Sequence, residues 1–515
     1  MKNVITGGTA EVSGRWPPAS AITRRLFSFP AFLGVLLLAG TLAGRCLNIS
    51  TSQPHSGAFS NISFEGDTWW HVVTGNRILS TGHWPSTDPY TFTVHGSPWI
   101  AYEWVGEVIM ALASRLAGLE GLMGLLLLMS GTYVLLVYCY AYQNCRNPMA
   151  AFLACVALLP LASSFFTLRP QMFAYIFLII TLVILEKFRN GHEKALWLLP
   201  VLFLIWVNTH STFVFGFFVV GVYWAAGLGG FSYKFVKGLR WGRVHRMQLE
   251  GIFLLCLVAS VITPYGSRAA AFPIERLFSP SSNLRTNTEF LPVSLGTLDG
   301  KLFVLLLVFF LVYVVVFQPT FRVEELALIS VAAYEAFAHI RFMLLFVPIF
   351  APVLAKAFAK LLPDGRRERE HPALHAVLIF LVVVLLAKLF PTKRQINNAI
   401  ANNFPASAVA YVIKHHVAGP MFNNVSWGGY LTWSLTPKHK VFIDSRDIFD
   451  YAGVFADYLE ILNGTSQTAS LLRKYHLRSC LFYRGAGLGS FLADTPGWRE
   501  VYRDQMSVIY VKLDR

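Results

Sequence analysis

Apolar segments recur along this chain of 515 residues, and they constrain its fold more than any other feature. A helix of about 20 apolar residues is long enough to cross the hydrocarbon core of a bilayer. The apolar segments cover residues 26–47, 119–142, 149–166, 171–188, 195–208, 211–230, 249–263, 300–317, 324–339, 341–360 and 373–390. Only 14% of the residues are charged, against about 25% in soluble domains, so the chain lacks the polar surface of a soluble enzyme. The sequence therefore predicts a mainly α polytopic membrane protein with about eleven transmembrane helices.

Basic residues set the expected orientation of these helices. The net charge is +15, but the Lys and Arg residues gather in short loops between apolar segments, where they mark the cytoplasmic side rather than a nucleic-acid-binding surface. We expect residues 1–25 in the cytoplasm, 26–47 as a retained first helix, and the C-terminus outside the plasma (inner) membrane. Two alternatives stay open: 26–47 is a cleaved signal, or 195–208 is re-entrant together with its neighbour.

Two parts of the chain lie outside the apolar segments. Residues 48–118 form an outer loop whose amphipathic stretches, 67–79 and 104–116, are too short to span and are expected to lie along the membrane interface. Residues 119–390 then form the multi-helix membrane domain. Residues 391–515 alternate helix-like and strand-like runs, which is typical of a small soluble α/β domain. The strand-like runs are 441–443, 480–483 and 507–511, and the helix-like runs are 406–415, 456–462 and 468–475.

Polar side chains gather at the predicted outer ends of the helices and in the outer loop. Because such groups are costly at membrane depth, they are candidates for function, although helix ends are also polar for simpler reasons. The candidates are Glu65, Asp67, Trp70, His71, Asp88, Glu103, Arg169, Asn208, His210, His339 and Arg341. We expect them to surround a cavity that opens outward beneath the outer loop and the C-terminal domain.

Asp67 stands at the start of the first amphipathic stretch. A carboxylate there gains from the helix N-terminus, either as an N-cap or as a general base that faces the cavity, with Glu65, Asp88 and Glu103 as acidic partners. His71 lies four residues further on, on the same helix face. Asp67, His71 and Glu103 are therefore also candidate ligands of a divalent cation, and no other cofactor is indicated.

Two arginines suit a phosphate or diphosphate, because a guanidinium presents a planar fork of donors. The candidates for this role are Arg169 and Arg341, with His210 and His339 nearby. The alternative is that each arginine forms an ion pair with Glu335 or Glu289.

Several motifs carry a family resemblance. They are DTWWHVVTGNRIL, TDPYTF, PWIAYEW, LRPQMFAY, WVNTHSTFVFG, TPYG, FNNVSWGGYLTW and VFIDSRD. The chain resembles the GT-C superfamily of polytopic membrane glycosyltransferases and, more closely, a bacterial group of uncharacterised GT-C-like proteins. Asp67 matches the catalytic carboxylate of the first outer loop, and Glu65 fills the neighbouring acidic position. Adjacent acids are the pattern in some of these enzymes, and the spacing here departs from it. The motif with Trp427 and Tyr430 loosely resembles the acceptor motif of oligosaccharyltransferases but lacks its aspartate.

The resemblance implies transfer of a sugar from a polyprenyl phosphate or diphosphate to an acceptor on the outer membrane face. The expected partners are the lipid bilayer, the polyprenyl-phosphate-linked sugar and an unknown acceptor, and nucleic acid is not expected. The candidate substrate or acceptor contacts are Trp70, His71, Asn208, Trp427, Tyr430, Asp444 and Arg446. Asp444 and Arg446 either face the cavity or close the C-terminal domain onto the membrane domain. The rival function is a transporter or flippase of a lipid-linked or anionic solute.

Overall fold

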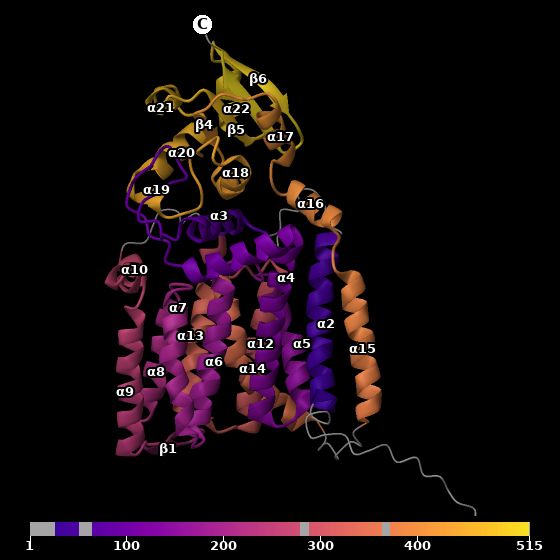
Figure 1. Ribbon diagram of the computed structural model, residues 1–515. Helices are drawn as coiled ribbons and strands as arrows, with labels where there is room; N and C mark the ends of the chain where they lie inside the picture. Colours follow the sequence, from indigo (N-terminus) through magenta and orange to yellow (C-terminus); the bar gives the residue numbers. More distant parts are fainter. Residues whose placement is uncertain (1–25, 51–63, 279–287, 363–370, 514–515) are drawn as a thin grey trace, which may run out of the picture.

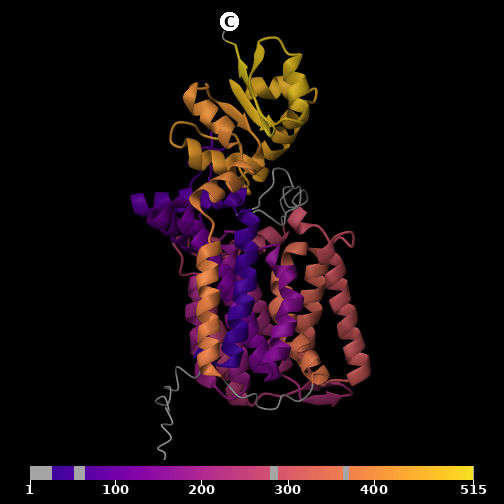
Figure 2. The same ribbon diagram turned by 90° about the vertical axis from the view of Figure 1, so that its right-hand side faces the viewer.

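The computed structural model describes residues 26–50, 64–278, 288–362 and 371–513 (Figure 1). A bundle of long helices carries a small α/β domain at one end, and two helices lie across the bundle between these parts. Figure 2 shows the same arrangement from the side, with the C-terminal domain standing over the end of the bundle. The expected cytoplasmic residues 1–25 lie outside the described residues.

Each predicted apolar segment contains a helix in the bundle, because its apolar side chains pack against one another or face outward. The helices are α2 (Phe29–Ser50), the second part of α4 (Trp104–Cys145), α5 (Pro148–Ser163), α6 (Gln171–Arg189), α7 (Leu198–Val207), α8 (Phe213–Ala226), α9 (Arg243–Ser260), α12 (Leu298–Phe317), α13 (Val323–Ala338), α14 (Met343–Leu361) and α15 (Pro372–Leu389). Within the described residues, six helices are long and apolar enough to cross a membrane by themselves: α2, α4, α6, α12, α14 with the turn before it, and α15. The polytopic fold is confirmed, and the number of crossings stays a prediction.

The two helices across the end of the bundle are α3 (Gly66–Thr81) and the first part of α4. They coincide with the amphipathic stretches predicted from the sequence. The backbone of α4 leaves helical geometry at Ala117 and Gly118, where the chain turns from the end of the bundle into it. α3 packs closely on α4 at Gly75, where a Cβ atom would overlap the carbonyl oxygen of Glu107. This close approach fixes the two helices that carry most of the candidate acidic residues.

The C-terminal domain contains a four-stranded sheet. Its strand order is β4 (Met421–Asn423), β5 (Ser479–Tyr483), β7 (Ser507–Lys512) and β6 (Trp498–Arg503), with β4 parallel to β5 and the other pairs antiparallel. The surrounding helices are α16 (Lys393–Ala401), α17 (Ala406–Lys414), α18 (Gly428–Leu435), α19 (Ile448–Tyr451), α20 (Val454–Asn463), α21 (Thr468–Lys474) and α22 (Gly487–Ala493).

The predicted strands and helices of this domain are only partly right. Two strands lie as predicted, in β5 and β7, and the three helix-like runs form α17, α20 and α21. The predicted strand at 441–443 is wrong, because Val441 makes only isolated bridges, to Met421 and to Thr91 of the outer loop. Strand β6 went unpredicted because its charged, partly exposed side chains hide the alternation of a strand.

Three further elements complete the fold. Helix α10 (Ser267–Phe278) lies beside the end of the bundle that carries the C-terminal domain (Figure 1). Short strands β1 (Phe231–Tyr233), β2 (Val236–Gly238) and β3 (Phe321–Arg322) form a small sheet at the opposite end. Short 3-10 turns cover Glu193–Trp197, Thr288–Phe290, Ile340–Phe342 and Val425–Trp427.

Candidate functional site

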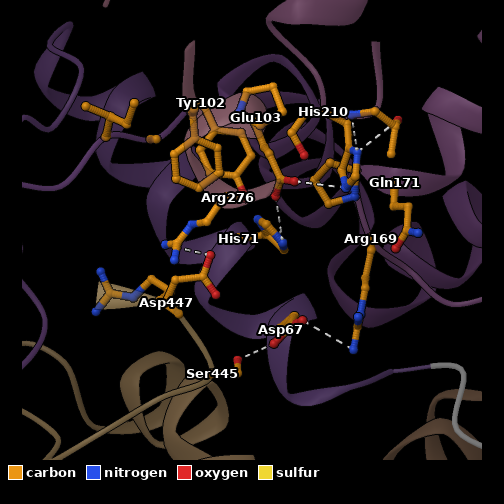
Figure 3. Close-up of a pocket in the computed structure, with 18 of the residues that line it drawn as sticks. Asp67, His71, Tyr102, Glu103, Arg169, Gln171, His210, Arg276, Ser445 and Asp447 are labelled. Carbon is orange, nitrogen blue, oxygen red and sulfur yellow. Dashed lines mark hydrogen bonds and ion pairs between the residues drawn. The ribbon is translucent and has the colours of Figure 1, made fainter. Parts of the chain in front are cut away.

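A cavity of about 510 Å³ lies where the membrane domain, α3, α10 and the C-terminal domain meet (Figure 3). The predicted residues that line it are Asp67, Trp70, His71, Glu103, Arg169, His210, Arg341 and Arg446. They come from five separate stretches of the chain, and the fold brings them to one end of the helix bundle. The positions of the polar residues along the sequence predict this gathering.

Asp67 lies in the first turn of α3 with its carboxylate at the cavity wall. The N-cap of this helix is Glu65, so the alternative that Asp67 itself is the N-cap is wrong. Asp67 Oδ1 accepts hydrogen bonds from the hydroxyl of Ser445 and, at 3.4 Å, from the indole Nε1 of Trp70. Burial raises the pKa of Asp67 to about 6, with the negative charge of Glu289 adding to the effect and the bond from Ser445 opposing it. Near neutral pH this carboxylate is therefore mostly ionised and can accept a proton.

Arg169 is the positive charge beside Asp67. Its Nη2 lies 3.2 Å from Asp67 Oδ2 and also contacts Glu65, and its Nη1 lies 3.4 Å from Glu289 Oε2. Arg341 approaches the same Glu289 oxygen at 3.7 Å and donates to Gln171 Oε1 at 2.7 Å. The predicted ion pairing with Glu289 is thus present for both arginines. Both guanidinium groups also line the cavity, where an anionic ligand can compete with these carboxylates.

A buried chain of His and Glu side chains forms another wall of the cavity. Glu103 lies between two imidazoles, with Oε2 3.4 Å from His71 Nε2 and Oε1 3.2 Å from His210 Nε2. The other ring nitrogen of His71 lies 3.2 Å from Glu107 Oε1. Burial lowers the pKa of His71 well below its usual value and that of His210 to about 3, while it raises the pKa of Glu103. Both imidazoles are therefore neutral at pH 7, and hydrogen bonds hold these His and Glu side chains in place.

The predicted cation ligands Asp67, His71 and Glu103 belong to two separate clusters. Asp67 pairs with Arg169 and Ser445, whereas His71 and Glu103 pair with each other. Across the part of the chain that the structure describes, no group of three or more His, Cys, Asp or Glu side chains has the placement of a metal site. As arranged, these three side chains do not fit a single cation.

The C-terminal domain closes the cavity and also contributes to its wall. Arg446 Nη2 lies 2.7 Å from Asp88 Oδ1 of the outer loop and 2.8 Å from Asp444 Oδ2, and all three side chains are almost fully buried. The next residue, Asp447, lies 2.9 Å from Arg276 of α10. Arg446 and Asp447 face the cavity, and their ion pairs with Asp88 and Arg276 also join the C-terminal domain to the rest of the protein. The cluster therefore has features of both predicted alternatives. Asp88 and Asp444 lie behind Arg446 and hold it in place.

Seven predicted residues are not among the described residues that line the cavity: Glu65, Asp88, Asn208, His339, Trp427, Tyr430 and Asp444. Asn208 accepts a hydrogen bond from Trp104 Nε1 at 2.7 Å and donates to the backbone carbonyl of Ile262, just beyond α9. His339 lies 2.9 Å from the carbonyl oxygen of Phe290. Trp427 and Tyr430 pack on aromatic rings of the C-terminal domain. None of them lines the cavity in the structure, and contact of any of them with a ligand stays a prediction.

Sequence reasoning missed several residues that line the cavity. Glu107 follows Glu103 by one helical turn, so its place on the same face was available from the spacing. Arg276 lies on α10, an amphipathic helix between two apolar segments, so its helical pattern was available from the sequence. Ser445 and Tyr102 lie within the motifs VFIDSRD and PWIAYEW but were not singled out, because only the docking of distant parts of the chain brings them to the cavity.

No family model and no curated protein matches the sequence. Solved structures do match. ArnT from Cupriavidus metallidurans bound to undecaprenyl phosphate has a TM-score of 0.51 at 13% identity, over 92% of this chain and 97% of that one. An oligosaccharyltransferase from Archaeoglobus fulgidus, tethered with an acceptor peptide, has a TM-score of 0.51 at 13% identity, over 87% and 69%. AglB from Archaeoglobus fulgidus, with an inhibitory peptide and a dolichol-phosphate, has a TM-score of 0.50 at 11% identity, over 87% of this chain and 69% of that one. The chain shares their fold, as the GT-C resemblance predicts.

Proposed function

We propose that this protein transfers a sugar from a polyprenyl-phosphate-linked donor to an acceptor on the outer face of the plasma membrane. One observation carries the proposal: the Asp67 carboxylate lies at a cavity on the end of the helix bundle, 3.2 Å from the guanidinium of Arg169. A base and a phosphate-binding cation side by side are what such a transfer requires. The proposed orientation puts the N-terminus in the cytoplasm and the C-terminal domain outside.

In the proposed reaction, Asp67 acts as the general base. It takes the proton of an acceptor hydroxyl or amide as the acceptor attacks the anomeric carbon, whose bond to the phosphate oxygen breaks on the opposite side. The configuration at that carbon is inverted. The leaving phosphate carries away the electron pair and needs no protonation, so the reaction requires no second carboxylic acid, unlike two-carboxylate glycoside hydrolysis.

Arg169 and Arg341 are the proposed phosphate ligands. Both guanidinium groups share Glu289, and both line the cavity. A donor phosphate would replace part of this pairing, and the positive charge would stabilise the negative charge that develops on the leaving group. The neutral His210 and His71, tied together by Glu103, would hold the opposite wall.

The fold shared with structures that hold undecaprenyl phosphate or dolichol-phosphate supports the proposed class of donor. The rival function, a transporter or flippase, is less favoured by the position of the polar groups. They gather at one end of the helix bundle, whereas transporters place their substrate sites near the middle of the membrane.

The experiment that tests the proposal is lipid mass spectrometry on cells that lack this protein. We expect a polyprenyl-phosphate-linked sugar to accumulate, and to return to its normal level when the wild-type protein is restored. The mass of the accumulated lipid would identify the sugar and the carrier. An unchanged lipid profile would contradict the proposal. Accumulation of the lipid on the cytoplasmic face alone, detected by its protection from a membrane-impermeant reagent, would favour the flippase.

A further inference from the structure

A second cavity, of about 450 Å³, lies between α2 and α5, on a side of the bundle away from the candidate active site. Its lining shares no described residue with the first cavity. The walls are mostly apolar, with Leu37, Gly40 and Gly44 from α2 and Phe152 and Leu159 from α5. A Cβ atom at Gly40 or Gly44 would meet no other heavy atom within 4 Å, so the glycines leave the groove open. We call this cavity the α2–α5 groove.

One charged side chain, Arg45, lies in the α2–α5 groove. It is only 4% exposed, and its guanidinium lies over the ring of Phe166, with 5.6 Å between Cζ and the ring centroid. Among the described residues, no hydrogen bond or ion pair joins this guanidinium to another side chain or carbonyl. The nearby hydroxyl of Ser164 is engaged elsewhere, because it donates to Asp299 Oδ2 at 3.0 Å.

The sequence offers no carboxylate close to Arg45 along the chain. Residues 51–63, which follow α2, contain neither Asp nor Glu. An arginine inside a membrane helix is costly unless a partner of opposite charge is present. The lipid bilayer itself supplies such partners, in the phosphate groups of its headgroups.

The position of Arg45 along α2 suits a lipid headgroup. It lies five residues before Ser50, the last residue of α2, which corresponds to about 8 Å along the helix axis. Figure 1 shows this end of α2 on the side of the bundle that carries α16 and the C-terminal domain. A phosphate at Arg45 would therefore lie near the membrane surface, with the apolar groove extending from it toward the middle of the bilayer.

We propose that the α2–α5 groove is a binding site for an anionic glycerophospholipid, whose phosphate pairs with Arg45 and whose acyl chain lies along Gly40 and Gly44. The amide of Asn48, one turn beyond Arg45, lines the same opening and supplies a donor for the headgroup. Free phosphate could pair with Arg45 and Asn48 but would gain nothing from the apolar walls of the groove. The site is independent of the proposed sugar transfer and stands or falls separately from it.

The test is native mass spectrometry of the full-length protein in a neutral detergent, titrated with palmitoyl-oleoyl phosphatidylglycerol or with the matching phosphatidylcholine. We expect the wild type to bind one phosphatidylglycerol more tightly than phosphatidylcholine. Arg45→Gln should weaken the binding of phosphatidylglycerol about fivefold, the effect of one basic residue on an anionic lipid. Arg394→Gln is the matched control, because it removes the same charge from an exposed residue of α16. It should leave the affinity unchanged.

A second variant tests the apolar part of the groove and does not depend on the stability of Arg45→Gln. At both Gly40 and Gly251 an added Cβ meets no other heavy atom within 4 Å. Gly40→Leu should fill the groove and exclude the lipid, whereas Gly251→Leu on α9 should not. Three results would overturn the proposal. One is wild-type affinity for phosphatidylglycerol in both Arg45→Gln and Gly40→Leu. The second is that inorganic phosphate displaces bound phosphatidylglycerol as effectively as free phosphatidylglycerol does. The third is Arg45-dependent binding of undecaprenyl phosphate that excludes phosphatidylglycerol.

Discussion

The hydroxyl of Ser445, in the C-terminal domain, donates a hydrogen bond to the carboxylate of Asp67 at the start of α3. The two residues are separated by 378 positions in the sequence. Through this bond the C-terminal domain reaches the proposed general base directly and lowers its pKa against the effect of burial. The domain is therefore part of the candidate active site.

Removal of the Ser445 hydroxyl should change the pH dependence of activity. In Ser445→Ala the carboxylate of Asp67 loses a stabilising hydrogen bond, so its pKa should rise above about 6, by about one pH unit. A general base works in its ionised form, so the acidic limb of the profile of kcat/KM should move to higher pH. Ser445→Thr keeps the hydroxyl and should restore the wild-type profile. Superimposable profiles for Ser445→Ala and the wild type would refute the role of this bond.

Arg446 should be essential for the docking of the C-terminal domain onto the outer loop. Its guanidinium pairs with the buried carboxylates of Asp88 and Asp444, and Arg446→Met would leave both without their counter-charge. We expect a loss of about 3–5 kcal/mol in the free energy of unfolding, measured by denaturant titration in detergent. Lys474→Met breaks the exposed pair with Asp457 and should cost less than about 1 kcal/mol. Equal losses in the two variants would contradict this assignment.

His210 should make the protein less stable as the pH falls. Burial lowers its pKa to about 3 in the folded state, below the ordinary value of about 6.5, so the unfolded chain binds the proton first. Stability is then complete above pH 6.5 and declines as the pH falls toward 3, by about 2 kcal/mol between pH 6.5 and pH 5. His210→Gln should lose this part of the pH dependence in thermal unfolding. If the melting temperature falls with pH equally in His210→Gln and in the wild type, the titration of His210 does not contribute to stability.

The close packing of α3 on α4 depends on the absence of a side chain at Gly75. Gly75→Ala would place a Cβ against the carbonyl oxygen of Glu107, and the helices would have to separate. We expect a lower melting temperature, equivalent to about 1–3 kcal/mol, together with reduced transfer activity. Gly124→Ala, at a position of α4 where a Cβ meets nothing within 4 Å, is the matched control. If Gly75→Ala has the same melting temperature as Gly124→Ala, α3 and α4 do not pack in this way.

The sequence predicts the helices well and the cavity only in part. Hydropathy is a local property, so the apolar segments and the amphipathic stretch that became α3 could be placed from the residues themselves. The gathering of Asp67, Arg169 and His210 at one end of the helix bundle followed from the same segments. The contacts of Asp67 with Ser445, and of Arg446 with Asp88, could not, because they depend on how the C-terminal domain docks on the outer loop.

The remaining differences also have physical reasons. Asn208 and Trp427 carry polar groups in the right regions but do not line the cavity, because Asn208 bonds to Trp104 and Trp427 packs on Tyr483. Arg45 was not singled out, since one basic residue near a helix end is unremarkable in sequence. Its significance depends on the groove beside it and on the partners that surround its guanidinium.

The most direct test of the central claim is the rate of sugar transfer by purified Asp67→Asn. With the lipid that accumulates in cells lacking the protein as donor, wild-type protein in detergent should release polyprenyl phosphate, measured by mass spectrometry. Asp67→Asn keeps the size of the side chain but cannot accept the proton, so the rate should fall by a factor of about 100 or more at an unchanged melting temperature. A folded Asp67→Asn protein that transfers the sugar at the wild-type rate would contradict the assignment of Asp67 as the general base.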